Sequence, residues 1–145
     1  MRLTWDEYFL ELATSVSKRS SCPRRSHGCV IVDDEKTVIS TGYNGAPPNI
    51  PDCIEVGCCV IKGHCLRAEH AEKACLLRAA RKGVNVSQGI AYITGKPCVH
   101  CTRALISAGI KKIVYRKDGH YSYPSEEQEL INFFIEHSNI EVVEY

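Results

Sequence analysis

The sequence lacks any apolar run long enough to cross a membrane, which argues against a chain built on membrane-spanning helices. Neither sign of charge dominates, because 18 Lys and Arg oppose 17 Asp and Glu for a net charge of +1. No global basic field therefore favours nucleic acid or an anionic membrane as a partner. The first residues, with Asp6 and Glu7, lack the basic-then-apolar layout of a secretory signal, so we expect a cytoplasmic protein.

Cysteine, by contrast, is abundant, with nine in 145 residues. An odd number without an export signal argues against a disulfide framework, and metal ligation in a reducing compartment accounts for it better. With 44% hydrophobic residues, the length suffices for one domain over residues 1–145 with a substantial core.

Hydrophobic spacing and turn residues predict an α/β protein in which strands alternate with helices. The predicted helices cover residues 3–19, 69–82, 98–108 and 125–137, and the predicted strands cover 28–32, 37–43, 89–94, 111–115 and 140–143. A short polar turn makes the first two strands an antiparallel hairpin, while the helix before the last strand makes the last two strands parallel. We expect a three-layer α-β-α sandwich with a mixed five-stranded sheet. Residues 44–67 have no clean period, so they should form a loop that is functional or held by a ligand.

An HAE triplet followed by a PCVHC segment carries the strongest chemical signal. We expect His70, Cys98 and Cys101 to bind zinc, since three protein ligands and one open position are typical of a catalytic zinc. Glu72 is then free to carry protons for a water whose pKa the zinc lowers to roughly 7. In this order the two motifs match H-x-E…P-C-x-x-C, the signature of zinc-dependent nucleobase deaminases.

The alternative interpretation makes Cys98 and Cys101 a redox pair, His70 a core histidine and Glu72 a solvated helix residue. A thioredoxin-like pair belongs after the first strand of a βαβ unit, whereas this pair comes after a helix and another strand. Both motifs instead open predicted helices, whose positive ends favour thiolates.

The chain resembles the deoxycytidylate (dCMP) deaminase family, within the cytidine deaminase-like fold, from Trp5 to about Tyr115. Besides the zinc motifs, the resemblance rests on TGYNGAP at 41–47, HCLR at 64–67 and AGIKKIVY at 108–115. It implies deamination of dCMP to dUMP for thymidylate synthesis, a cytosolic setting, a homo-oligomer, and control by dCTP and dTTP.

The resemblance also implies substrate-binding residues: Asn44 would bind the deoxyribose, Tyr115 would help line the nucleotide pocket, and Ala71 would contact the substrate. Arg24 and Arg25, near a predicted strand start, are candidates for holding a phosphate, with a solvated basic pair as the alternative.

Two positions depart from the family pattern and bear on the identity of the nucleotide. Ala74 stands where the family has an asparagine, and His27 replaces an apolar residue at a strand entry. Other substrates therefore stay open: dCTP, cytidine, guanine, a base in a nucleic acid, or an intermediate of riboflavin or modified-base synthesis. A non-catalytic nucleotide-binding module is a further alternative, although the intact Glu72 argues against it.

A second, structural zinc is also expected, because most of the remaining cysteines lie in the irregular loop. By resemblance to bacterial and phage members, Cys22 and Cys53 match such a site, and His64 with one of Cys58 or Cys65 would complete it. Buried free thiols are the alternative. His120 and His137 are expected on the surface.

Overall fold

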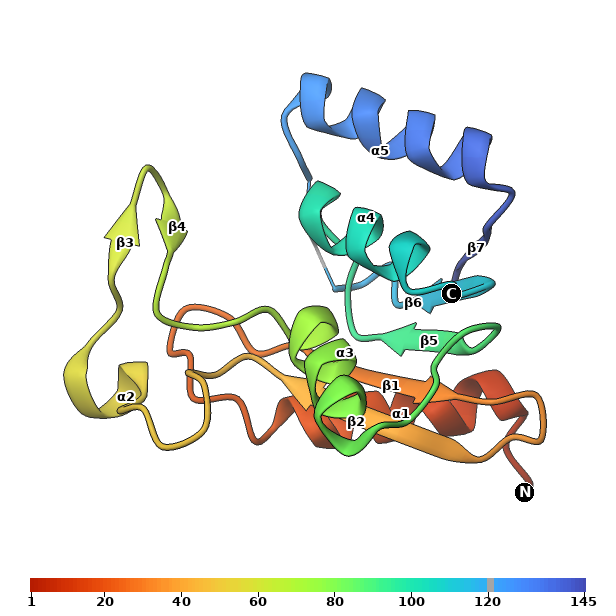
Figure 1. The fold of residues 1–145 in the computed structure, drawn as a ribbon, viewed down its shortest axis with the longest axis horizontal. Helices are drawn as coiled ribbons and strands as arrows, with labels where there is room; N and C mark the ends of the chain where they lie inside the picture. The colour runs from red at the N-terminus through yellow and green to blue at the C-terminus, as the bar shows by residue number, and fades with distance from the viewer. Residues whose placement is uncertain (120–121) are drawn as a thin grey trace.

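The computed structural model describes residues 1–119 and 122–145 (Figure 1). The elements in chain order are α1 (Trp5–Ser17), β1 (Gly28–Val32), β2 (Val38–Tyr43), α2 (Cys53–Val56), β3 (Val60–Ile61), β4 (His64–Cys65), α3 (Ala71–Lys82), β5 (Ile90–Ile93), α4 (Val99–Ser107), β6 (Lys112–Tyr115), α5 (Ser125–Ser138) and β7 (Glu141–Glu144). Every predicted helix and strand is present. The additional elements α2, β3 and β4 lie in the segment for which the sequence predicts only a loop.

The main sheet has five strands in the order β2-β1-β5-β6-β7. β1 runs antiparallel to β2 and β5, whereas β5 with β6 and β6 with β7 are parallel. The predicted antiparallel hairpin and the predicted parallel final pair are therefore both confirmed. Because β5 and β6 are parallel, their carboxyl ends share one edge of the sheet, and α4 begins beyond β5 at that edge.

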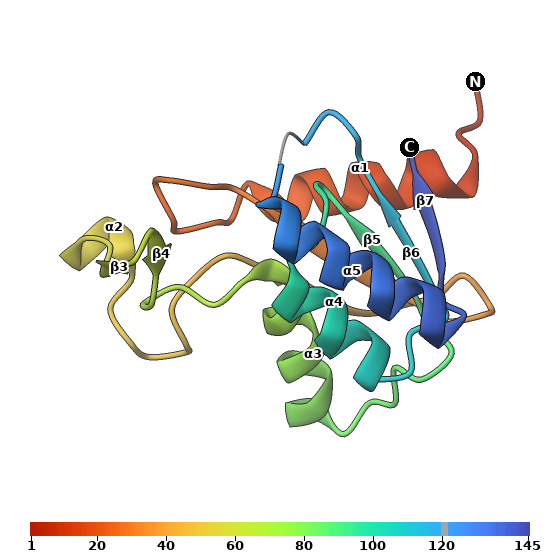
Figure 2. The same cartoon turned by 90° about the horizontal axis from the view of Figure 1, so that it is seen from above.

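Helices cover both faces of this sheet, which gives the predicted three layers (Figure 2). On one face, Phe9 and Leu10 of α1 are fully buried in a cluster with Tyr92. On the other face, Cys75 of α3 and Leu105 of α4 are fully buried in a second cluster. The two helices that carry the predicted zinc motifs thus pack on the same face.

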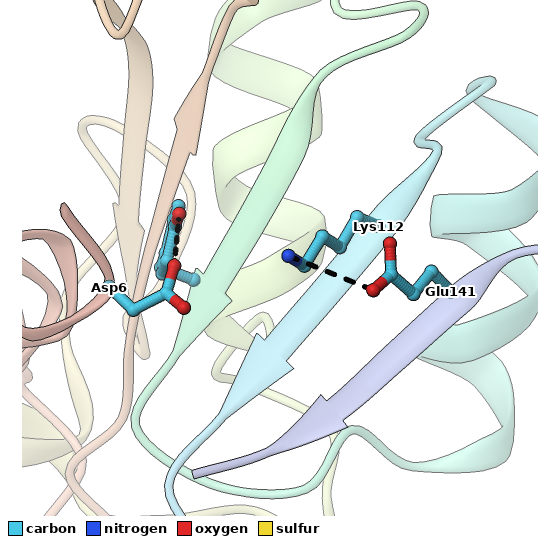
Figure 3. A network of polar contacts seen from close by, with 4 residues as sticks. Asp6, Lys112 and Glu141 are labelled. Atoms are coloured by element: carbon cyan, nitrogen blue, oxygen red, sulfur yellow. Dashed lines mark hydrogen bonds and ion pairs between the residues drawn. The ribbon is translucent and has the colours of Figure 1, made fainter.

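Polar contacts also join neighbouring elements across the sheet (Figure 3). The Tyr92 hydroxyl donates a hydrogen bond to the Asp6 carboxylate at 2.8 Å, which connects β5 to α1. Lys112 of β6 pairs with Glu141 of β7 at 3.8 Å. These contacts lie away from the zinc motifs and therefore serve the fold.

Helix α3 packs directly on the backbone of β2 at Gly42. A Cβ at this position would lie 2.3 Å from the Cys75 backbone N and 2.4 Å from the Ala71 carbonyl O. The Ser40 hydroxyl also donates to the Cys75 carbonyl at 2.7 Å. These contacts fix the start of α3, and hence the HAE triplet, relative to the sheet.

The segment with α2, β3 and β4 projects from the body of the molecule as an arm (Figure 1). Asp52 anchors it, because its Oδ1 accepts hydrogen bonds from the Ser21 hydroxyl at 2.7 Å and the Ala46 N–H at 3.0 Å. β3 and β4 form an antiparallel ladder of two residue pairs. In the described part of the chain, no helix is long and apolar enough to cross a membrane.

Candidate metal centre and cleft

Two helix starts bring the predicted zinc ligands together. His70 is the N-cap of α3 and Cys98 is the N-cap of α4, while Cys101 lies in the first turn of α4. The His70 Nδ1 lies 3.5 Å from the Cys98 Sγ and 3.4 Å from the Cys101 Sγ. The predicted convergence of these three side chains is therefore present in the structure.

The spacing of these donors fits a tetrahedral zinc. Ordinary Zn–S and Zn–N bond lengths place sulfur and nitrogen ligands about 3.6 Å apart on a tetrahedron. The observed separations of 3.4 and 3.5 Å are close to that value, and all three ligand atoms lie within 4.8 Å of one another. One imidazole and two thiols are also donors that zinc prefers.

The surroundings of Cys98 favour its thiolate. A hydrogen bond with Cys101 lowers the pKa of Cys98 most, and together with the His70 ring and the Cys101 backbone N–H it brings that pKa to about 3. The same hydrogen bond raises the pKa of Cys101. The pair thus shares one proton, which a bound cation would displace because metal ligands must be deprotonated.

Glu72, the second residue of α3, is 6% exposed beside these ligands. Burial raises the pKa of its carboxyl above the usual range, although the charge of His70 works in the opposite direction. A buried carboxyl with a raised pKa is suited to exchange protons near neutral pH. Glu72 is absent from the ligand group and is available for this task.

A cavity of about 50 Å³ lies over His70, Glu72 and Cys98. Asn44 lines it, and its Oδ1 accepts a hydrogen bond from the His27 backbone N–H at 2.8 Å. Its amide NH₂ group is therefore the part left to face a ligand. We refer to this cavity as the cleft.

The other predicted substrate residues divide between the cleft and other places. Arg25 lines the cleft, whereas Arg24 is exposed and contacts the Gly63 carbonyl of the arm at 3.5 Å. Ala71, the first residue of α3, is fully buried and is not part of the cleft lining.

The structure places Tyr115 outside the lining of the cleft. It lines a different cavity, of about 210 Å³, together with Ile113 and Ile131. Ile113 and Tyr115 are two residues apart on β6, so their side chains lie on the same face of the strand, and both belong to the same core cluster. Strand periodicity thus turns Tyr115 under α5 and away from the cleft.

Three cleft residues with polar side chains had no role assigned from the sequence: His27, Lys96 and Tyr123. The Tyr123 hydroxyl donates to the Lys96 carbonyl at 2.6 Å, and the Lys96 ammonium donates to Gln128 of α5. His27 had a signal as an unusual residue at a strand entry, and Lys96 precedes the PCVHC segment. Tyr123 lies beyond every motif, so only the fold reveals it.

Burial lowers the pKa of His27, and the nearby positive charges of Arg25 and His70 add to the shift. These effects favour the neutral form of the ring. Elsewhere, His137 is exposed on α5 as expected, while His120 lies outside the described residues.

A second group of ligand-type side chains lies in the arm. Cys53, Cys58 and Cys65 have their sulfur atoms within 4.8 Å of one another. The Cys53 and Cys65 sulfurs are 3.7 Å apart, and two sulfurs on a tetrahedral zinc would lie about 3.8 Å apart. These residues therefore also fit a zinc ion.

Electrostatics supports the same interpretation. Burial alone would raise the pKa of Cys65, but backbone N–H groups of Ala68, Arg67 and Cys59 outweigh it and bring that pKa to about 6. A thiolate is thus favoured at neutral pH before any metal binds.

Two residues predicted for this second site lie at its border. Cys22 and His64 line a small hollow together with Cys65. The structure does not place the exposed His64 in the group whose ligand atoms converge. Burial is the main reason why the pKa of Cys58 is raised, and the charges of Cys65 and Cys22 add to that shift. Cys22 therefore lies close to the group.

Comparisons with known proteins agree with this arrangement. Residues 3–117 match the model of the cytidine and deoxycytidylate deaminase zinc-binding region. The deoxycytidylate deaminase of Mycobacterium phage D29 is 35% identical over 128 residues, which cover 81% of this chain and 98% of that protein. ComE operon protein 2 of Bacillus subtilis is 38% identical over 117 residues, which cover 81% of this chain and 61% of that protein.

The fold agrees as well. The crystal structure of the dCMP deaminase from cyanophage S-TIM5 in complex with dCMP and dUMP matches with a TM-score of 0.81. The match covers 100% of this chain and 99% of that chain at 24% identity. This chain spans only part of some relatives, such as 38% of the Schizosaccharomyces pombe deoxycytidylate deaminase, to which it is 39% identical.

Proposed function

We propose that this chain, which belongs to the cytidine and deoxycytidylate deaminase family, hydrolyses dCMP to dUMP and ammonia. The observation that carries the proposal is the convergence of three zinc-type ligands beside a buried carboxyl that is not needed as a ligand. The family is a zinc-binding one. The phage and yeast relatives named above are deoxycytidylate deaminases, which favours dCMP as the substrate.

His70, Cys98 and Cys101 are the residues that would hold the catalytic zinc. When bound, zinc lowers the pKa of a water and so supplies a nucleophile at neutral pH. The group offers three protein donors with the buried Glu72 carboxyl beside them, and a catalytic zinc has three protein ligands and one open position.

Glu72 moves the protons in the proposed reaction. Its carboxylate accepts a proton from the attacking water and delivers it to the adjacent ring nitrogen of cytosine. It then transfers the second proton of that water to the exocyclic amine, which leaves as ammonia. Water and dCMP are consumed, and dUMP and ammonia are formed.

Asn44, Arg25 and the start of α3 would bind the rest of the nucleotide. The Asn44 amide NH₂ can donate to a deoxyribose hydroxyl, and Arg25 is a cation for the phosphate. The predicted contact with Ala71 would come through its backbone N–H, which has no partner within the helix, because the residue itself is buried and lies outside the cleft lining.

The direct test is a rate assay with dCMP, dCTP, cytidine and guanine, in which loss of absorbance follows deamination. We expect dCMP to give the highest kcat/KM. A preference for another of these compounds would replace dCMP as the substrate, while turnover of none of them would favour a non-catalytic binding module.

We further propose a structural zinc in the arm, held by Cys53, Cys58 and Cys65 with Cys22 as the fourth ligand. The 3.7 Å sulfur spacing and the low pKa of Cys65 support it. Elemental analysis should find two zinc ions per chain. A content of one zinc per chain that does not change when Cys65 is replaced would refute the proposed structural zinc.

A cytosolic location, a homo-oligomer and control by dCTP or dTTP are expectations that come with the family resemblance. Analytical ultracentrifugation with and without each nucleotide tests the assembly, and the dCMP assay repeated with dCTP or dTTP tests the control.

A further inference from the structure

The imidazole of His27 occupies a space that a side chain at position 95 would otherwise fill. A Cβ at Gly95 would lie 2.9 Å from the His27 Cε1 and 3.3 Å from its Nδ1. Both residues line the cleft. The absence of a side chain at Gly95 thus allows the His27 ring to form part of the cleft wall.

Hydrogen bonds determine which ring nitrogen carries the proton. The Thr94 Oγ1 accepts a hydrogen bond from the Gly28 backbone N–H at 3.1 Å, and it lies 3.1 Å from the His27 Nδ1. The hydroxyl has one hydrogen and two lone pairs, so it can donate to Nδ1 while it accepts from Gly28, and we assign this arrangement. The proton of the neutral ring is then on Nε2. Since Nδ1 faces Thr94, Nε2 is the nitrogen left for a ligand.

The other donors in the cleft wall indicate what this ligand group is. Arg25 and Lys96 line the same cleft, and both carry positive charge. Glu72 is the acidic residue of this lining, and its proposed task is proton transfer beside the zinc ligands. A group of nitrogen donors with two cations suits the phosphate of a nucleotide better than its neutral base.

We propose that His27 determines specificity by donating a hydrogen bond from Nε2 to the 5′-phosphate of the substrate. This inference rests on the proposed function, because it names the residue by which a nucleoside monophosphate is preferred over the nucleoside. It also gives a chemical reason for the histidine at a strand entry where an apolar residue would suit the core.

The test compares dCMP with deoxycytidine in three variants. His27→Phe keeps a ring beside Gly95 but has no donor, and His27→Gln keeps a donor but has no ring. His137→Gln is the matched control on the exposed face of α5. For His27→Phe we expect kcat/KM for dCMP to fall about 10- to 100-fold, mainly through KM, since hydrogen bonds to charged groups are the strong ones. Deoxycytidine turnover should fall less than dCMP turnover in this variant, because deoxycytidine has no phosphate for the Nε2 donor to bind.

His27→Gln keeps a hydrogen-bond donor, so it should keep most of the preference for dCMP over deoxycytidine. Its kcat/KM for dCMP should stay within about fivefold of the wild-type value. If His27→Phe does not fold, His27→Val removes the donor with a smaller side chain. An equal loss for dCMP and deoxycytidine, or no loss for either, would overturn the inference.

Equilibrium binding separates this inference from the proposed reaction. Calorimetry with dUMP and deoxyuridine measures the phosphate contribution without turnover. If the wild type does not deaminate dCMP, the proposed function fails; a loss of dUMP affinity confined to His27→Phe would still support the phosphate contact. Unchanged dUMP affinity in that variant would overturn the contact even if the wild type is active.

Discussion

The two groups of ligand side chains differ in what holds them in place. His70, Cys98 and Cys101 lie at the starts of two helices that pack on the main sheet. Cys53 and Cys65 lie on a four-residue helix and a two-residue strand in a projecting arm. The first group is therefore positioned by the core, whereas the second has little core around it.

This difference indicates opposite relations between metal and fold. In the first group, the buried apolar clusters form the geometry, and the metal would add reactivity. In the arm, large apolar side chains such as Ile54 and Val56 are 69% and 53% exposed, so burial contributes little stability. There the metal would contribute the folding free energy itself.

The largest expected effect is that of Glu72→Gln, which removes proton transfer from the first group without removing a ligand. We expect kcat for dCMP to fall by about 1,000-fold, within the usual range for general acid–base catalysis. Zinc content, measured by elemental analysis, should not change. Glu136→Gln on exposed α5 is the control, and near-normal turnover of Glu72→Gln would refute its role.

Removing one ligand from each group tests the contrast directly. Cys101→Ala should lose one zinc per chain and more than about 100-fold in activity, since even disturbing an outer partner of a metal ligand costs 10- to 100-fold. The core should still fold, as judged by circular dichroism, because its apolar clusters are intact.

Cys65→Ala should also lose one zinc, but its main effect should be faster proteolysis within residues 53–65, with activity reduced less than about tenfold. Equal protease resistance of the two variants would show that the arm does not depend on a metal.

Gly42→Ala tests whether the core positions the first group. The added Cβ would meet the backbone of α3 at 2.3 and 2.4 Å, so the helix must shift. We expect a loss of about 1–3 kcal/mol in the free energy of unfolding, measured with urea, and lower activity with it. Gly45→Ala is a milder control, since its closest contact is the Ser21 hydroxyl at 3.0 Å. Equal stability of the two variants would contradict the close packing.

The smallest effect should follow from Asp52→Ala, which removes the anchor of the arm. Loss of the Ser21 and Ala46 hydrogen bonds should cost about 1 kcal/mol, confined to the arm. Hydrogen exchange should then accelerate in residues 53–65 and stay unchanged in α3. Faster exchange in α3 would mean that the two regions are coupled.

Much of the core and of the first group could be predicted, because both depend on local patterns. Apolar periodicity predicted the helices that the structure shows as α3 and α4. The order of strands and helices predicted that β6 and β7 are parallel. The HAE and PCVHC motifs open those helices, so their convergence followed from topology.

The arm and parts of the cleft could not be predicted, for two physical reasons. α2, β3 and β4 are too short to show a period, and they are held by hydrogen bonds and by contacts between cysteines far apart in the sequence, with little apolar burial. The resemblance gave a role for Tyr115 but not the face of β6 to which it points. Tyr123 enters the cleft by a long-range contact with Lys96.

The position of Tyr123 has a further consequence for which part of the chain builds the cleft. Tyr123 and Gln128 lie after residue 117, where the match to the family model ends, yet both bond to Lys96 in the cleft wall. One side of the cleft wall thus depends on a segment beyond the family-model match, whereas His70, Cys98 and Cys101 all lie within that match. The cyanophage dCMP deaminase structure matches the whole chain, so the fold it shares with this protein includes that segment.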